Sequence, residues 1–275
     1  MSLTLMYITN NPQVAVIAQK NGVDRIWVDL ETLGKEERQG HIDSVKSHHS
    51  VEDIKKIVPL LDHAEMLVRV NPLNAKSEEE INAVIDAGAD LVMLPMWKNA
   101  EDVKNFINLV GGRAGTILLL ETKEAVESLD EVLNVEGIDE IHIGLNDLHL
   151  SYNMRFMFEP LADGMVEKIC KKISNYNIPY GFGGIAKLGY GDLPAENIIQ
   201  EHYRLGSTRA ILSRSFCNTE KIISIEEIEN VFSANMKSLR EYEKIAENLS
   251  NDNYLKNQKE VIEKVNRIKQ ARMGA

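Results

Sequence analysis

The stretch that decides the fold runs from residue 116 to residue 147, where two apolar runs each end close to an acid. The first run is Thr116-Ile-Leu-Leu-Leu, closed by Glu121, and the second is Ile141-His-Ile-Gly, followed by Leu145-Asn-Asp147. Short apolar runs bounded by turn residues are typical of buried strands, whereas the segment 122–133 between them predicts a helix. A strand, a helix and another strand in this order indicate a parallel sheet with both acids at one edge.

The same alternation continues along the whole chain. Apolar runs rich in branched residues recur at 3–8, 25–30, 66–70, 91–94, 116–120, 140–143, 179–182 and 209–212, with helices expected to begin near residues 12, 51, 78, 100, 123, 161, 194 and 225. Capping patterns before the helices at 51, 78 and 100 (Ser50 to Asp53, Ser77 to Glu80, and Asn99) support this division. Eight strand and helix repeats with strands apolar on both faces predict an α/β protein, a (β/α)8 TIM barrel.

Composition limits the classes of protein. The chain has 275 residues, is 44% apolar and 27% charged and carries a net charge of -11, which argues against nucleic acid or an anionic membrane as a partner. No apolar run reaches the length of a membrane span, no signal pattern is present, and two distant cysteines predict no disulfide framework. We expect a cytoplasmic protein with a barrel over residues 1–246. The apolar stripe in 247–275 predicts a C-terminal helix that packs on a neighbouring subunit of a homo-oligomer.

Two acids at the ends of successive buried strands are costly to desolvate unless a cation lies between them. Glu121 and Asp147 are therefore predicted ligands of a divalent metal, with Mg²⁺ favoured and Mn²⁺ or Co²⁺ as alternatives. The simpler alternative is that each acid stabilises the N-terminus of the helix that follows it.

Other polar and glycine residues follow the remaining strands, where the active face of such a barrel lies. Gly183 and Gly184 are expected to allow close approach of the backbone to a ligand, or else to form a plain turn. Ser213 and Arg214 are expected to bind a distal carboxylate or phosphate, or to pair with surface acids. His142, within the sixth strand, is expected to be a buried histidine with its hydrogen bonds satisfied. The long connections 31–50 and 148–160 are candidate lids.

Five segments of the chain form a pattern that is typical of a known family. They are Val68-Arg-Val-Asn-Pro72, Asp86-Ala-Gly-Ala-Asp-Leu-Val-Met-Leu-Pro95, Leu120-Glu-Thr122, Val135-Glu-Gly-Ile-Asp139 and Ile143-Gly-Leu-Asn-Asp-Leu148. In this order and spacing they resemble the HpcH/HpaI aldolase and citrate lyase beta-subunit family. The resemblance implies a metal-dependent carbon–carbon lyase in which Glu121 and Asp147 hold the metal. It also implies that Arg69 faces the 2-oxo oxygen of the substrate and that backbone amides near Asn146 hold its carboxylate. A salt bridge from Arg69 to Asp29 or Glu31 is the structural alternative, and both roles can coexist.

The chain departs from the pattern of the aldolase branch at the position of the general base. The aldolase branch of the family has a histidine directly after the acid that ends the second strand, but this chain has Asp29-Leu-Glu-Thr32, and a threonine cannot serve as that base. His48 and His49, in the same connection, are the candidate replacements, with a solvated pair of histidines or a metal-bound hydroxide as alternatives. Glu31 is a candidate substrate-binding residue of the same segment.

The expected function is a class II aldolase that reversibly cleaves a 4-hydroxy-2-oxo acid to pyruvate and an aldehyde through a metal-stabilised enolate. Two alternatives remain open. One is a lyase or hydrolase of malyl, citramalyl or citryl thioesters of coenzyme A, and the other is a non-catalytic barrel that binds a 2-oxo acid.

Overall fold

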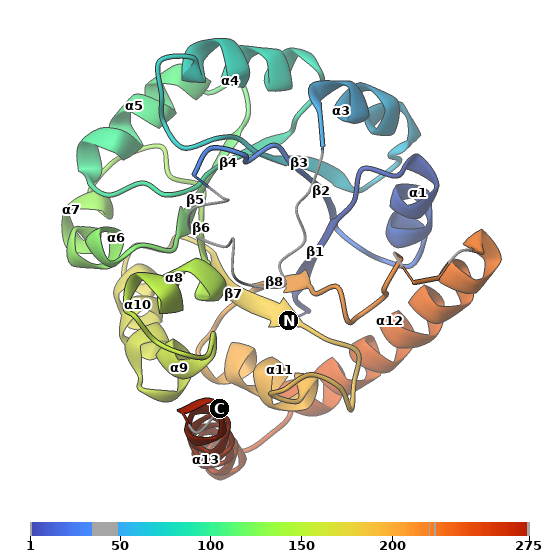
Figure 1. Cartoon of the computed structure of the whole chain (residues 1–275), viewed down its shortest axis with the longest axis vertical. Helices are drawn as coiled ribbons and strands as arrows, with labels where there is room; N and C mark the ends of the chain where they lie inside the picture. Colours follow the sequence, from blue (N-terminus) through green and yellow to red (C-terminus); the bar gives the residue numbers. More distant parts are fainter. Residues whose placement is uncertain (1, 35–48, 220, 223, 274–275) are drawn as a thin grey trace.

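Eight parallel strands close into a barrel in the computed structural model, which describes residues 2–34, 49–219, 221–222 and 224–273. Each strand pairs with the next one in the chain, and β8 pairs with β1 (Figure 1). The strands are β1 (Thr4–Ile8), β2 (Arg25–Asp29), β3 (Glu65–Arg69), β4 (Leu91–Leu94), β5 (Gly115–Leu120), β6 (Glu140–Ile143), β7 (Tyr180–Ile185) and β8 (Arg209–Leu212). The predicted (β/α)8 barrel is confirmed.

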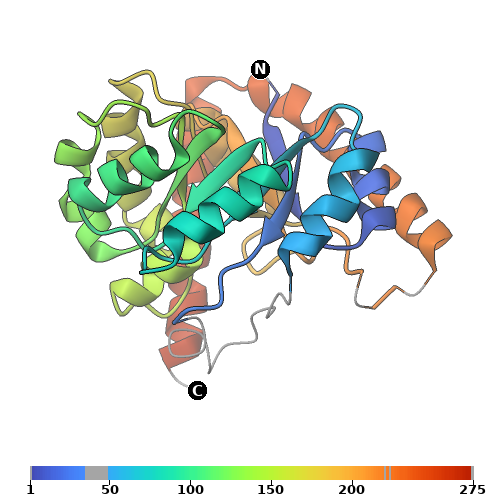
Figure 2. The same ribbon diagram turned by 90° about the horizontal axis from the view of Figure 1, so that it is seen from above.

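Helices surround the barrel, as Figures 1 and 2 show. They are α1 (Pro12–Lys20), α3 (Val51–Ile57), η1 (Val58–Leu60), α4 (Ser77–Asp86), α5 (Ala100–Val110), α6 (Lys123–Glu127), α7 (Leu129–Val132), α8 (Leu145–Ser151), α9 (Glu159–Ala162), α10 (Met165–Ser174), α11 (Ala195–Arg204), α12 (Ile225–Glu247) and α13 (Asn251–Met273). Most predicted helix starts are confirmed, including the capping box of Ser50 with Asp53 and the cap at Asn99.

Three local predictions are wrong. The single helix expected over 122–133 is divided at Ser128 into α6 and α7. Ser77 does not cap α4, because its Oγ accepts a hydrogen bond from the Asn74 N–H, which lies before the helix. The connection 148–160 is not a plain loop, because α8 extends through its first residues and α9 begins before its end.

The C-terminal helix α13 lies against α11 and α9 of its own chain (Figure 1). Val261 and Val265 are buried in this contact, and Asn257 hydrogen-bonds to Asn197 of α11. The predicted helix is therefore present, and part of its apolar stripe packs on its own barrel. Leu255 of the same stripe is exposed, and packing on a neighbouring subunit stays a prediction.

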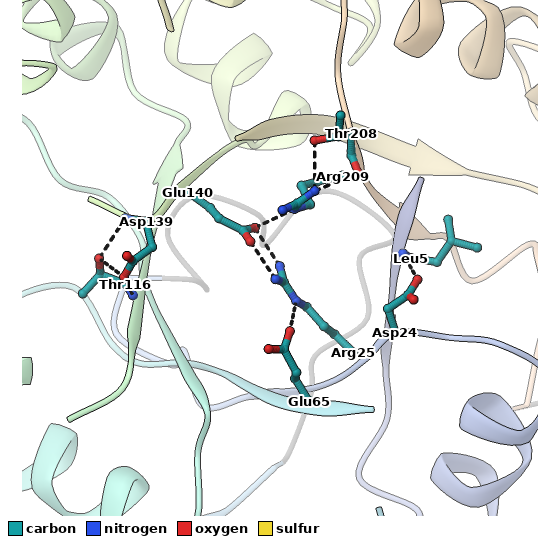
Figure 3. Close-up of polar contacts among 9 residues, drawn as sticks. All are labelled: Leu5, Asp24, Arg25, Glu65, Thr116, Asp139, Glu140, Thr208 and Arg209. Carbon is teal, nitrogen blue, oxygen red and sulfur yellow. Dashed lines mark hydrogen bonds and ion pairs between the residues drawn. The ribbon is translucent and has the colours of Figure 1, made fainter. Parts of the chain in front are cut away.

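The interior of the barrel consists of a charged layer and an apolar layer. At the N-terminal ends of the strands, Arg25 makes two hydrogen bonds to Glu140 at 2.7 and 2.6 Å and one to Glu65 at 2.8 Å, and Arg209 lies 3.1 Å from Glu140 (Figure 3). Above this network lies an apolar layer that consists of Met6, Trp27, Leu67, Leu91, Met93, Ile117 and Leu119. The interior is thus closed below, and the cavity described next lies at the opposite end of the strands.

Candidate active site

A cavity of about 350 Å³ opens at the C-terminal ends of the strands. The residues that line it come from several strands and from the connections that follow them. They are Tyr7, Ile8, Trp27, Asp29, Arg69, Leu119, Glu121, His142, Ile143, Gly144, Leu145, Asn146, Asp147, Met157, Gly183, Gly184, Ile211, Leu212, Ser213, Arg214, Cys217 and Thr219. Most of the residues predicted from the sequence therefore share one cavity, on the face where this fold places its active sites.

Glu121 follows the last residue of β5 and is 2% exposed. Its Oε1 accepts a hydrogen bond from the Met96 N–H at 3.1 Å, and a Cβ on Gly144 would lie only 2.8 Å from its Oε2. The glycine that follows β6 therefore leaves room for this carboxylate. Burial, and then the charge of Asp147, raise the pKa of Glu121 well above its ordinary value, although Arg69 partly opposes the shift.

Asp147 lies in the first turn of α8 and is 7% exposed. The positive end of the helix dipole favours a carboxylate there, so the helix-terminus alternative holds in part for this residue. It does not hold for Glu121, because Thr122 caps α6 by accepting a hydrogen bond from the Ala125 N–H at 3.0 Å. Glu121 thus has no role in helix capping. Its carboxylate instead interacts electrostatically with that of Asp147, which lines the same cavity.

The two acids could hold a small divalent cation. In the described part of the chain, no group of three or more histidine, cysteine, aspartate or glutamate residues is arranged to hold a metal. A metal bound to Glu121 and Asp147 would therefore complete its coordination with water and substrate oxygens, which suits Mg²⁺ or Mn²⁺. The raised pKa of Glu121 fits this site, because two buried carboxylates that repel one another are stabilised by a cation between them.

Arg69, the last residue of β3, is paired with acids on one side and faces the cavity on the other. Its guanidinium donates two hydrogen bonds of 2.8 Å to Asp29 and lies 3.2 Å from Glu31. Burial lowers its pKa, but Asp29 and Glu31 outweigh that effect and raise it above the ordinary arginine value. The salt bridge proposed as an alternative is therefore present, and it fixes the position of a permanent cation in the cavity wall. Glu31 is 1% exposed and does not line the cavity.

The two candidate bases are placed differently. His48 lies outside the described residues. His49 accepts a hydrogen bond on Nδ1 from the Asp29 N–H at 3.0 Å and is not among the residues that line the cavity. In this arrangement its neutral ring carries the proton on Nε2, so His49 would have to release the Asp29 contact to accept a proton. Its role as a base stays a prediction.

The glycines and the β8 connection meet at one side of the cavity. Gly183 has a φ of 56° and an added Cβ would lie 3.1 Å from Leu145, while a Cβ on Gly184 would lie 3.2 Å from Ser213. Protein side chains therefore occupy the space beside both glycines, and the close approach of a ligand to this backbone stays a prediction. The alternative of a plain turn is wrong, because both glycines lie within β7. Ser213 and Arg214 also line the cavity, and their proposed contact with a distal carboxylate or phosphate stays a prediction.

Sequence reasoning missed several residues that line the cavity. Tyr7, Trp27, Cys217 and Thr219 carry no motif. Alternation along β2 predicts that Trp27 faces the interior, whereas Tyr7 belongs to the core between strands and helices. His142 was expected to be satisfied, and this is wrong. It is buried, but neither ring nitrogen has a hydrogen-bond partner among the described residues. A sequence shows that a strand residue faces inward, but not which atoms surround it.

None of the helices in the described ranges is both long enough and apolar enough to span a membrane. Among characterised proteins, the chain is 24% identical over 139 residues to a hydroxypyruvate/pyruvate aldolase from Roseovarius nubinhibens, a match that covers 38% of this chain and 53% of that protein. It is also 29% identical over 79 residues to a pyruvate kinase from Agrobacterium vitis, with 29% of this chain and 16% of the kinase covered. The chain thus spans about half of one relative's length and a smaller part of the other.

Solved structures share the fold. An HpcH/HpaI aldolase from Desulfitobacterium hafniense superposes with a TM-score of 0.61 at 16% identity, over 87% of this chain and 93% of that one. The citrate synthase SbnG gives a TM-score of 0.58 at 17% identity, over 87% and 94%. At these identities the structures support the barrel architecture alone. The sequence profile of the HpcH/HpaI aldolase/citrate lyase family, however, matches residues 3–157, more than half of the chain, and the chain therefore belongs to this family.

Proposed function

We propose that this protein is a divalent-metal-dependent carbon–carbon lyase that cleaves a 4-hydroxy-2-oxo acid to pyruvate, or a close analogue of pyruvate, and an aldehyde. The observation that carries the proposal is the pair of buried acids, Glu121 and Asp147, in the same cavity as the fixed cation Arg69. Membership of the aldolase family and the partial match to a hydroxypyruvate/pyruvate aldolase support a 2-oxo acid as the substrate.

The reaction explains why these residues are needed. Cleavage of the bond between C3 and C4 leaves negative charge on the 2-oxo oxygen, and the transition state is stabilised by whatever positive charge lies there. A divalent cation held by Glu121 and Asp147 would act as a Lewis acid on that oxygen. Arg69 would donate a hydrogen bond to the same oxygen, and its contacts with Asp29 hold the guanidinium in place before the substrate arrives.

The carboxylate of the substrate needs donors rather than a second cation. Backbone N–H groups at the start of α8, beside Asn146, are available at a helix N-terminus, where anions are favoured. Gly183 and Gly184 would let the backbone of β7 approach the bound molecule. The proton of the 4-hydroxyl group needs a base, for which His48, His49 and water remain the candidates.

A panel assay tests the proposal. The purified protein is incubated with 4-hydroxy-2-oxo acids or with malyl and citryl thioesters of coenzyme A, in the presence of Mg²⁺, Mn²⁺ or a chelator, and pyruvate and thioester release are followed separately. We expect metal-dependent release of pyruvate from the oxo acids. If only the thioesters are turned over, the aldolase proposal is wrong and the lyase or hydrolase alternative replaces it. That alternative is considered because the family includes citrate lyases as well as aldolases.

Binding without turnover would have a different meaning. If pyruvate binds in the presence of metal but no substrate of either class is cleaved, the protein is a 2-oxo acid binding barrel and the catalytic proposal is wrong. We further propose that the protein acts in the cytoplasm and that it forms a homo-oligomer. Size-exclusion chromatography with light scattering would test the oligomeric state.

A further inference from the structure

Asn71, two residues after the end of β3, uses both polar atoms of its side-chain amide in hydrogen bonds. Its Oδ1 accepts from the N–H groups of Thr32 and Leu33, each at 2.9 Å. Its Nδ2 donates to the Leu30 carbonyl oxygen at 3.3 Å and to Glu80 Oε1 at 2.8 Å. Because backbone N–H groups only donate and carbonyl oxygens only accept, these partners fix which way the amide points.

These contacts continue the pairing of β2 with β3 beyond the strands themselves. A backbone hydrogen bond of 2.9 Å still joins the Leu30 N–H to the Arg69 carbonyl oxygen. Residues 32–34 are exposed, so burial contributes little to their position. The side chain of Asn71 therefore helps to fix the course of residues 30–33.

Glu31 lies within this segment and contacts the cation of the proposed active site. It is 1% exposed, and its Oε2 lies 3.2 Å from Nη1 of Arg69. Asp29 accepts hydrogen bonds from Nε and Nη2 of the same guanidinium, so the two acids together contact all of its nitrogens. Neither Asn71 nor Glu31 lines the cavity. We therefore expect Asn71 to act on a bound molecule through Glu31 and Arg69.

Glu80 anchors Asn71 from the other side. It lies in the first turn of α4, and the Asn71 N–H donates to both of its carboxylate oxygens at 3.3 Å. Burial raises the pKa of Glu80, and the hydrogen bonds from Asn71 partly oppose this shift. The half-buried carboxylate is thus stabilised by these hydrogen bonds, which connect Asn71 to a helix of the barrel wall.

We propose that Asn71 and Glu80 are positioning residues of the active site, which fix residues 30–33 and thereby hold the Glu31 carboxylate against Arg69. A guanidinium held at all of its nitrogens presents its remaining N–H groups in one direction before a substrate arrives, which lowers the entropy lost on binding. This inference rests on the proposed function, because it assumes that Arg69 contacts the 2-oxo oxygen of the bound molecule.

Two binding measurements test the inference. Calorimetry measures the affinity for Mg²⁺ alone and then the affinity for pyruvate in saturating Mg²⁺. Asn71→Ala is expected to weaken pyruvate binding about tenfold, the lower end of the loss seen when a residue that orients a binding group is removed. Its Mg²⁺ affinity should stay unchanged, because the hydrogen bonds of the Asn71 side chain reach neither Glu121 nor Asp147. A residue with a merely structural role would not lower one affinity and spare the other.

Matched variants connect the effect to these contacts. Glu80→Ala should weaken pyruvate binding in the same way by a smaller factor, and Glu80→Gln, which keeps an acceptor for Asn71, should retain most of the affinity. Asn74→Ala is the control. Asn74 lies in the same connection, but its side chain bonds locally, to the Pro72 carbonyl oxygen and the Lys76 N–H. The control should keep both affinities.

A double-mutant cycle tests whether Asn71 acts through Glu31. In a Glu31→Ala protein, the further change Asn71→Ala should not weaken pyruvate binding again, because the carboxylate that Asn71 positions is already absent. A second loss of the same size in this background would overturn the inference.

The outcomes separate this inference from the proposed function. Unchanged pyruvate affinity in Asn71→Ala, or a parallel fall of the Mg²⁺ and pyruvate affinities, would overturn the inference while the 2-oxo acid site stands. If circular dichroism shows that Asn71→Ala does not fold, Glu80→Ala takes its place and the same two results overturn the inference. If the unmodified protein binds no pyruvate in saturating Mg²⁺, the proposed function and this inference both fail.

Discussion

Replacing Glu121 with glutamine is expected to stabilise the metal-free protein and to abolish its stabilisation by metal. The glutamine Oε1 can still accept the hydrogen bond from the Met96 N–H, so the local structure is preserved. What changes is the charge. Burial, and then repulsion by Asp147, raise the pKa of Glu121 in the folded protein, so ionisation of this group at neutral pH opposes folding.

The sign and size of the effect follow from linkage. Because the folded pKa is raised, the favourable contribution of the protonated acid is complete below the unfolded pKa, about 4.3, and is lost as the pH rises through the folded pKa. At pH 8 the charge that glutamine removes therefore costs about 1–3 kcal/mol, the range for a buried group without full compensation. Metal at 100 times its dissociation constant would add about 2.7 kcal/mol to the free energy of unfolding of the unmodified protein, which corresponds to about 5–10 °C in melting temperature. It would not stabilise the variant.

Thermal unfolding with chelator and with Mg²⁺, at pH 8 and at pH 4, measures both effects. With chelator at pH 8 the variant should melt above the unmodified protein, and this difference should shrink at pH 4. Glu201→Gln is the control, because Glu201 is equally buried but pairs with Arg204 on α11 and does not line the cavity. It should keep the full response to metal. A Glu121→Gln variant that is still stabilised by Mg²⁺ to the same extent would refute the assignment of Glu121 as a ligand.

Three further changes probe other parts of the molecule. Arg69→Lys keeps the charge but loses the two-point contact with Asp29, so kcat/KM for the oxo acid should fall about 10²–10³-fold in steady-state assays, and a loss below tenfold would contradict its proposed role. Gly144→Ala places a Cβ 2.8 Å from Oε2 of Glu121 and should weaken metal binding about 10–100-fold by calorimetry; unchanged affinity would count against the site. Glu140→Gln leaves the buried Arg25 and the half-buried Arg209 short of a partner and should cost about 3–5 kcal/mol in urea unfolding at pH 7. Because these arginines lower the pKa of Glu140 despite its burial, the contribution is present above the unfolded pKa, about 4.3, and the loss should disappear as the pH falls through the lower folded pKa.

The barrel itself was predictable from the sequence for a physical reason. Parallel strands covered by helices are apolar on both faces, so runs such as Thr116 to Leu120 are marked by composition alone. The strand bounds agree within one residue, as at β5, which begins at Gly115, except at β7, which ends at Ile185, three residues later than predicted. The order of strands and helices then leaves few ways to close the sheet, and the residues after each strand are brought to one end.

Local hydrogen bonding was less predictable because competing partners come from distant parts of the chain. Ser77 and Glu80 have the spacing of a capping box, yet Glu80 accepts from Asn71, which follows β3. No helix start was predicted near residue 145, but Asp147 lies within the first turn of α8. Both differences arise from contacts that the chain pattern does not encode. The same limit applies to His142, whose unpartnered nitrogens depend on what the other strands leave around it.

The buried acids at the two ends of the barrel differ in whether the described residues supply a positive partner. This difference separates a role in stability from a role in function. Glu140, at the N-terminal end, lies within hydrogen-bond distance of two arginines, and its pKa is lowered although burial opposes this. Glu121, at the C-terminal end, is buried as deeply but makes no ion pair within the described residues, and its pKa is raised. A protein that needed Glu121 only for packing would be more stable with a neutral residue there. The presence of an acid here, beside Asp147, therefore favours a bound cation as the partner that the described residues do not supply.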